Sequence, residues 1–153
     1  MERNPVKDAA GPNDFPHAKK VESRARKAGY YITYKNGEYY DYQQGRAINS
    51  VIQKTLKCLG EKSNNLLTLL DILIPMNMQQ AEIVATVYAA WNNLILEGKA
   101  FSDEDIVLEA RENWHKDKLN IPRDKFFKAI EWMRKNELLI PKRNGKIVSA
   151  KNK

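Results

Sequence analysis

The sequence predicts a mainly α fold with two small β-hairpins, an α+β chain with a helical core. Three observations predict it. Apolar residues recur at helical spacing over most of the chain after residue 46. Two Asn-Gly pairs, Asn36-Gly37 and Asn144-Gly145, stand between short runs typical of strands. The composition, 42% hydrophobic and 29% charged, is that of a globular protein.

The composition also predicts a cytoplasmic location. No apolar run approaches the roughly 18 residues of a membrane span, so no membrane partner is expected. The first fifteen residues, MERNPVKDAAGPNDF, are polar and lack the apolar stretch of a secretory signal. The single cysteine, Cys58, has no partner for an internal disulfide, which favours a reducing compartment.

Charge is distributed in three blocks. Residues 1–60 hold 11 Lys/Arg against 6 Asp/Glu, residues 61–110 hold 2 against 8, and residues 111–153 hold 13 against 5. The net charges are therefore +5, −6 and +8. Basic ends around an acidic middle indicate that one surface faces a polyanion while another faces water or a protein.

The N-terminal part of the chain begins with a predicted flexible arm, residues 1–16, which contains three prolines and a glycine without periodicity. Residues 17–75 form the next predicted domain. It opens with a short basic helix over residues 17–29, which ends at Gly29.

A tyrosine-rich hairpin, YYITYKNGEYYDY, follows the basic helix. An Asn-Gly type I′ turn predicts the pairs Tyr34 with Tyr39 and Tyr31 with Tyr42. Such aromatic pairs stabilise a ladder, and we expect the hairpin to pack against the helix after it. A tyrosine ribbon is also able to stack on bases or grip a peptide.

Two apolar helices complete this domain. The first, over residues 46–59, carries one apolar stripe and ends at Gly60. The second, LLTLLDILIP after an expected N-cap at Asn64, is apolar nearly all round. A helix of that kind is predicted to be central to the core.

Residues 76–149 form the third predicted domain, with three helices and the second hairpin. The first helix spans about residues 79–97. The second opens with Ser102 and three acids, which indicate helix capping rather than a metal site. The third begins near Pro122. The residues predicted to be buried together are Val84, Trp91, Leu94, Trp114, Phe126, Ile130 and Met133.

Three helices followed by a hairpin resemble the winged-helix DNA-binding family in order and size over residues 79–149. The resemblance implies a winged-helix-like C-terminal half, with residues 122–137 as the recognition helix and residues 142–146 as the wing tip. The segment HKDKLNI is longer than the usual connection between the last two helices. A fainter resemblance, carried by YAAWNNLILEGK and ENWHKDKL, is to the C-terminal region of type I restriction motor subunits. Residues 150–153 are expected to be a tail.

The third helix has a predicted basic outer face. At 100° per residue, Lys128 and Lys135 lie opposite Phe126 and Ile130. Asp124 and Glu131 share this outer face and would repel phosphates. Few arginines are placed for base readout, so phosphate contacts are expected. The candidate DNA-binding residues are Arg123, Lys125, Lys128, Lys135, Lys142, Arg143 and Lys146. A secondary surface comprises Lys19, Lys20, Arg24, Lys27, Tyr31 and Tyr40.

No catalytic site is predicted. The two histidines, His17 and His115, are far apart and have no cysteine at metal-ligand spacing. No phosphate-binding glycine loop or nucleophile elbow is present in the sequence. We therefore expect a non-enzyme without cofactor or metal.

Two functions remain open at this point. The first is a DNA-binding accessory domain of a restriction or other DNA-processing machine. The second is a protein-interaction adaptor or small subunit of a larger assembly, without nucleic-acid contact. A binding assay across a salt series separates them, because phosphate-directed binding weakens steeply with salt.

Overall fold

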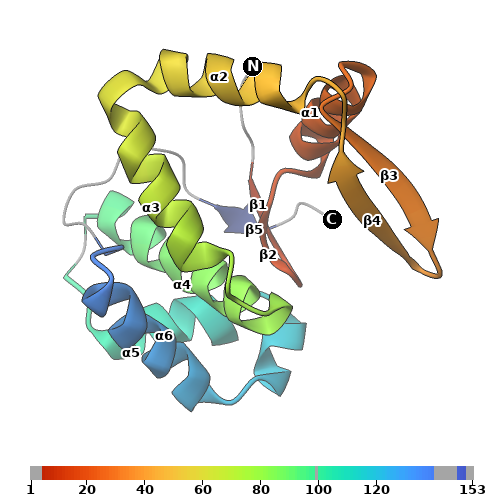
Figure 1. The fold of residues 1–153 in the computed structure, drawn as a ribbon. Coiled ribbons are helices and arrows are strands. Elements are labelled where there is room, and N and C mark those ends of the chain that lie inside the picture. Colours follow the sequence, from red (N-terminus) through yellow and green to blue (C-terminus); the bar gives the residue numbers. More distant parts are fainter. Residues whose placement is uncertain (1–4, 99, 140–147, 151–153) are drawn as a thin grey trace. The chain divides into compact units, whose positions relative to one another are not determined.

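The computed structural model of the chain describes residues 5–98, 100–139 and 148–150. It is mainly helical with small β-sheets, as predicted (Figure 1). The chain divides into two compact units. One combines Met1–Asp14 with Met76–Lys153, and the other is the intervening Phe15–Pro75; we call them the split unit and the inserted unit. Among the described residues, no helix has the length and apolar character needed to cross a membrane.

The split unit contains helices α4 (Met78–Leu96), α5 (Asp103–Val107) and α6 (Arg123–Lys135). Capping boxes begin two of them: Asn77 with Gln80 at α4, and Ser102 with Asp105 at α5. The acidic start of α5 therefore satisfies the helix terminus, as the sequence predicts. A π-helical segment (Leu108–Glu112) and a 3-10 turn (Lys116–Asn120) lead from α5 to α6.

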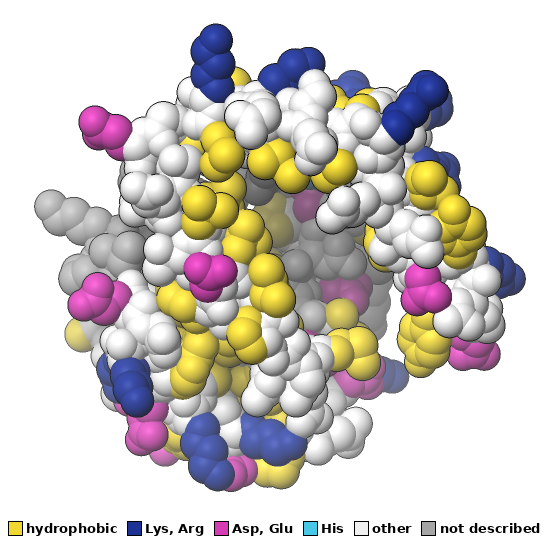
Figure 2. Space-filling model, viewed as in Figure 1, with side chains coloured by type: hydrophobic (Ala, Val, Ile, Leu, Met, Phe, Trp, Pro, Cys, Tyr) yellow, Lys and Arg dark blue, Asp and Glu magenta, His cyan; other side chains and the backbone are white. Residues whose placement is uncertain are grey.

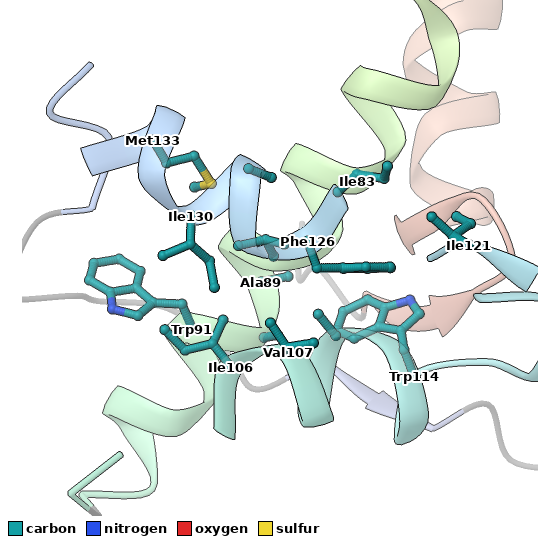
Figure 3. Close-up of a cluster of buried hydrophobic side chains, with 14 of the residues drawn as sticks. Ile83, Ala89, Trp91, Ile106, Val107, Trp114, Ile121, Phe126, Ile130 and Met133 are labelled. Carbon is teal, nitrogen blue, oxygen red and sulfur yellow. The ribbon is translucent and has the colours of Figure 1, made fainter. Parts of the chain in front are cut away.

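The hydrophobic core of this unit joins all three helices. Figure 3 shows Trp91, Ile106, Phe126 and Ile130 pointing toward one another from α4, α5 and α6. The predicted burial is confirmed for Trp91, Trp114, Phe126, Ile130 and Met133, whereas Val84 and Leu94 are partly buried against this cluster. Helical periodicity therefore identified the core-facing side of each helix.

The N-terminal residues differ from the predicted flexible arm. Strands β1 (Val6–Asp8) and β2 (Gly11–Asn13) pair as an antiparallel hairpin in the split unit. The indole Nε1 of Trp114 donates to the Asp8 carbonyl at 3.1 Å. The Lys7 ammonium donates to Glu109 at 2.5 Å. Contacts distant in sequence thus order a segment that has no periodicity of its own.

The C-terminal end of the split unit is anchored through buried Asn93. Its side chain donates to the Val148 carbonyl at 3.0 Å and accepts from the Val148 amide at 2.8 Å. Strand β5 (Ser149–Ala150) then pairs in parallel with β1, so the predicted tail at residues 150–153 begins within a strand. The predicted hairpin at Asn144-Gly145 lies outside the described residues. That hairpin and the winged-helix resemblance stay predictions.

The inserted unit contains α1 (Phe15–Lys27), a ribbon of β3 (Tyr31–Asn36) and β4 (Tyr39–Gln44), α2 (Ile48–Leu59), a 3-10 turn (Gly60–Lys62) and α3 (Ser63–Leu73). The base of the ribbon closes through a tight backbone crossing. The Gly45 amide donates to the Tyr30 carbonyl at 3.0 Å. A Cβ on Gly45 would lie 2.2 Å from the Gly29 carbonyl oxygen, so only glycine fits there.

The predicted ribbon is present, but its register is shifted by two residues. Tyr39 pairs with Asn36 rather than Tyr34, and Tyr31 pairs with Gln44 rather than Tyr42. Gly37, with φ of +61°, takes the first central turn position, as in a type II′ turn. Asn36 stays in the strand and donates to Asp41 at 2.9 Å. A shift of two keeps every side chain on its predicted face.

The prediction that the helix after Asn64 is central to a core is wrong. Helix α3 begins at Ser63, and neither α2 nor α3 has a buried residue. Figure 1 shows α3 leaving α2 at a steep angle rather than folding back along it. The two apolar surfaces therefore do not cover each other.

Candidate functional site

Two arginines of α6 are paired with acids of the same unit. Arg123 pairs with Glu104 at 2.9 Å and with Glu112 at 3.2 Å. Nearby, Arg134 donates two hydrogen bonds to Asp103, and these hold the pKa of that carboxyl below its ordinary value. Both guanidinium groups thus already have carboxylate partners.

The predicted lysines of α6 are less constrained. Lys128 pairs with Asp124 one turn earlier at 3.1 Å, and this hydrogen bond lowers the pKa of Asp124. The Lys128 side chain is 75% exposed, so water screens the pair strongly. Lys125 donates to the neutral Gln79 at 2.5 Å, and its charge helps to lower the pKa of neighbouring Asp124. Lys135 is exposed and has no ion pair among the described residues. Lys125, Lys128 and Lys135 therefore remain candidate phosphate ligands on α6.

The predicted wing residues Lys142, Arg143 and Lys146 lie outside the described residues. The contribution of the wing to DNA binding stays a prediction.

The secondary surface has a clearer basic face, on α1. Lys20, Arg24 and Lys27 are exposed and lie within about 60° of one another around the helix. We call them the cation stripe. None of the three has an ion pair or hydrogen bond from its side chain among the described residues. Glu22, the only acid in α1, lies on the opposite side of the helix.

Glu22 is occupied by the tyrosine ribbon. Its carboxylate accepts from the Tyr42 hydroxyl at 2.7 Å, and its carbonyl accepts from the Tyr31 hydroxyl at 2.9 Å. The hydrogen bond to Glu22 raises the pKa of Tyr42, and burial together with the Glu22 charge raises the pKa of Tyr31. The two rings lie 5.3 Å apart. Predicted site residue Tyr31 is therefore a structural link between the ribbon and α1.

Two other predicted residues of this surface differ in their surroundings. Lys19 lies 4.2 Å from the centre of the Phe15 ring, a cation–π contact that leaves its charge unneutralised. Tyr40 pairs with Lys35 toward the ribbon tip and is 58% exposed. Both are available to a ligand.

Two exposed tyrosines lie outside the predicted set of site residues. Tyr34 and Tyr39 lie on the ribbon face that points away from Tyr31 and Tyr42. They are 50% and 74% exposed, and no ring contact to either occurs among the described residues. Strand alternation could have identified them, because both share one face in either register.

A buried ion pair was also missed. Lys118 is fully buried and donates to Glu82, whose side chain is 25% exposed. Glu82 belongs to α4 and Lys118 to the connection before α6, so the pair fixes that connection to the core. Its role is structural.

Exposed hydrophobic side chains form a surface along α3. On the face shown in Figure 2, hydrophobic side chains gather along this helix. The exposed residues are Leu67, Leu69, Leu70 and Ile74. The inserted unit thus presents an apolar helix as well as a basic one.

Metal-ligating side chains do not cluster in the described part of the chain. No group of three or more His, Cys, Asp or Glu residues there could hold a metal ion. His115 accepts from the Asp117 amide at 3.2 Å and so begins a 3-10 turn.

No family model, curated protein or solved structure matches this chain.

Proposed function

We propose that this protein is a non-enzymatic DNA-binding module whose contacts are mainly with phosphates. The observation that carries the proposal is the cation stripe. Its three side chains share one exposed face over about 10 Å of helix, and no acid in the described part of the chain pairs with them. Like charges one turn apart, such as Lys20 and Arg24, destabilise a helix, and a bound polyanion reverses that effect.

Helix α6 is a second contact in this proposal. Lys125, Lys128 and Lys135 remain its phosphate ligands, together with the predicted wing. Arg123 and Arg134 contribute less, because binding a phosphate requires them to leave their carboxylates. The restriction-subunit resemblance favours an accessory role in a cytoplasmic DNA-processing machine.

The test is the affinity for a labelled duplex across a salt series, measured by fluorescence anisotropy. Each lost phosphate contact removes about 0.9 from the slope of log affinity against log salt. The variant K20Q/R24Q/K27Q should therefore bind more weakly, with a slope flatter by about two to three units.

A matched control removes the same charge from the same unit. Lys54, Lys57 and Lys62 are exposed on α2 and the turn after it. The variant K54Q/K57Q/K62Q should change the slope by less than one unit, since it spares the cation stripe. Equal slopes for the two variants would reject the stripe as the phosphate site.

The second candidate function is the protein-interaction adaptor, which the apolar surface of α3 favours. Purified protein should bind the dye 1-anilinonaphthalene-8-sulfonate, and L67Q/L70Q/I74Q should reduce that binding. Sedimentation velocity then shows whether the chain associates with itself. A monomer that does not bind the dye would show that its own chain covers α3, and the adaptor proposal would then fail.

A further inference from the structure

We propose that the outer half of the β3–β4 ribbon stacks unpaired bases, so that the protein prefers single-stranded DNA to duplex. This inference rests on the proposed function and names its substrate class. It starts from three exposed rings in one short segment, Tyr34, Tyr39 and Tyr40. Figure 2 shows hydrophobic side chains, tyrosine among them, exposed along the ribbon.

The ribbon uses its tyrosines in two different ways. At its base, Tyr31 and Tyr42 are engaged with Glu22 and with each other. Toward the tip, Tyr34 and Tyr39 lie on the free face, and they have neither a ring contact nor a hydroxyl partner among the described residues. The outer tyrosines therefore do not stabilise the ribbon as the inner pair does.

Exposed rings on a basic unit match the chemistry of a single strand. Every base has a π-face that stacks on an aromatic ring, and a single strand offers these faces where a duplex hides them. Residues 15–47 carry seven Lys/Arg against three Asp/Glu, so the unit attracts the phosphates that come with the bases. Lys35 places one of these cations beside Tyr40, on the ribbon face opposite that of Tyr34 and Tyr39.

One acid lies on the same face as the outer rings. Asp41 pairs with Tyr34 across the ribbon and accepts from the Asn36 amide. Its charge repels phosphate, so D41N should tighten single-strand binding severalfold at low salt. Unchanged or weaker binding by D41N would place the bases away from Tyr34 and overturn the stacking site.

The main experiment compares a 20-nucleotide oligothymidylate with a 20-base-pair duplex by fluorescence anisotropy. Loss of one stacking ring weakens binding by about 5- to 150-fold. The variant Y34V/Y39V, which keeps strand-forming residues, should lose at least about 25-fold for the oligothymidylate and less than threefold for the duplex. The control Y34F/Y39F keeps both rings and should stay within threefold for each.

The outcomes separate this inference from the proposed function. If the parent binds both DNAs equally and Y34V/Y39V changes neither, the ribbon does not stack bases although the protein binds DNA. If the variant weakens both DNAs to the same extent, the rings support the unit rather than select single strands. If the parent binds neither DNA, the proposed function and this inference fail together. Circular dichroism of the variants shows whether their secondary structure is retained.

Discussion

The buried pair Lys118–Glu82 predicts an asymmetric response to mutation. Lys118 is fully buried, whereas Glu82 is 25% exposed. In E82Q the ammonium stays buried without a counter-charge, and removal of one partner from a buried pair costs about 3–5 kcal/mol of unfolding free energy. We expect about 3 kcal/mol, because Glu82 is only partly buried. In K118M the carboxylate left behind still reaches water, so the change should stay within about 1 kcal/mol.

Urea unfolding followed by tryptophan fluorescence measures this difference. Trp91, Trp114 and Trp132 all belong to the split unit, so the signal reports on the unit that holds the pair. With an m value of about 1–3 kcal/mol/M, E82Q should lower the urea midpoint by about 1–3 M. The double variant E82Q/K118M should resemble K118M. If K118M is as destabilising as E82Q, the reasoning about the stranded ammonium is wrong.

Three further outcomes follow from contacts in the split unit. S102A removes the capping side chain of α5 and should lower the unfolding free energy by about 1 kcal/mol in the same urea assay. N93L leaves the Val148 amide and carbonyl unpaired, at about 1–3 kcal/mol each, and should accelerate hydrogen exchange of that amide by NMR. Arg134 lowers the pKa of Asp103, so the pair stabilises the fold above the ordinary value near 3.8 and loses this effect as pH falls through the lowered pKa. The stability difference between the parent and D103N should therefore shrink below about pH 4.

Local signals predicted the helices of the split unit well. Ser102 marked the start of α5, Pro122 marked the start of α6, and the spacing of Phe126, Ile130 and Met133 identified a buried face. Caps and periodicity act within one or two helical turns, so they are visible in a short window of sequence. Helices α5 and α6 were predicted well because their start signals and apolar spacing lie within their own segments of sequence.

The strands of the same unit were not predictable in this way. Strand β2 consists of Gly11, Pro12 and Asn13, which have low strand propensity. Contacts from Lys7 to Glu109 and from Trp114 to Asp8 hold the hairpin in place across about a hundred residues of sequence. Tertiary context of this kind overrides local propensity and leaves no mark in the segment itself.

The candidate site also combines features visible within one helix and contacts between residues distant in sequence. The cation stripe is a property of one helix, so the sequence placed Lys20, Arg24 and Lys27 on the secondary surface. Arg123 pairs with Glu104, which lies 19 residues earlier in the sequence. Arg134 pairs with Asp103, which lies 31 residues earlier. A helical wheel of α6 cannot show either pair. The sequence therefore did not indicate that Arg123, a predicted site residue, already has carboxylate partners.

Helices α2 and α3 of the inserted unit have apolar stripes but no buried residue. An amphipathic stripe therefore predicts which face of a helix should be covered, but not which segment or protein covers it. Isolated helices shorter than about 12–15 residues are marginal in water, and α2 and α3 have 12 and 11 residues. Their stability must therefore come from packing, yet the inserted unit itself buries neither helix. The cation stripe belongs to α1, a different helix from the one that carries the exposed apolar residues. The L67Q/L70Q/I74Q variant removes none of the proposed phosphate ligands, so it should keep its affinity for DNA.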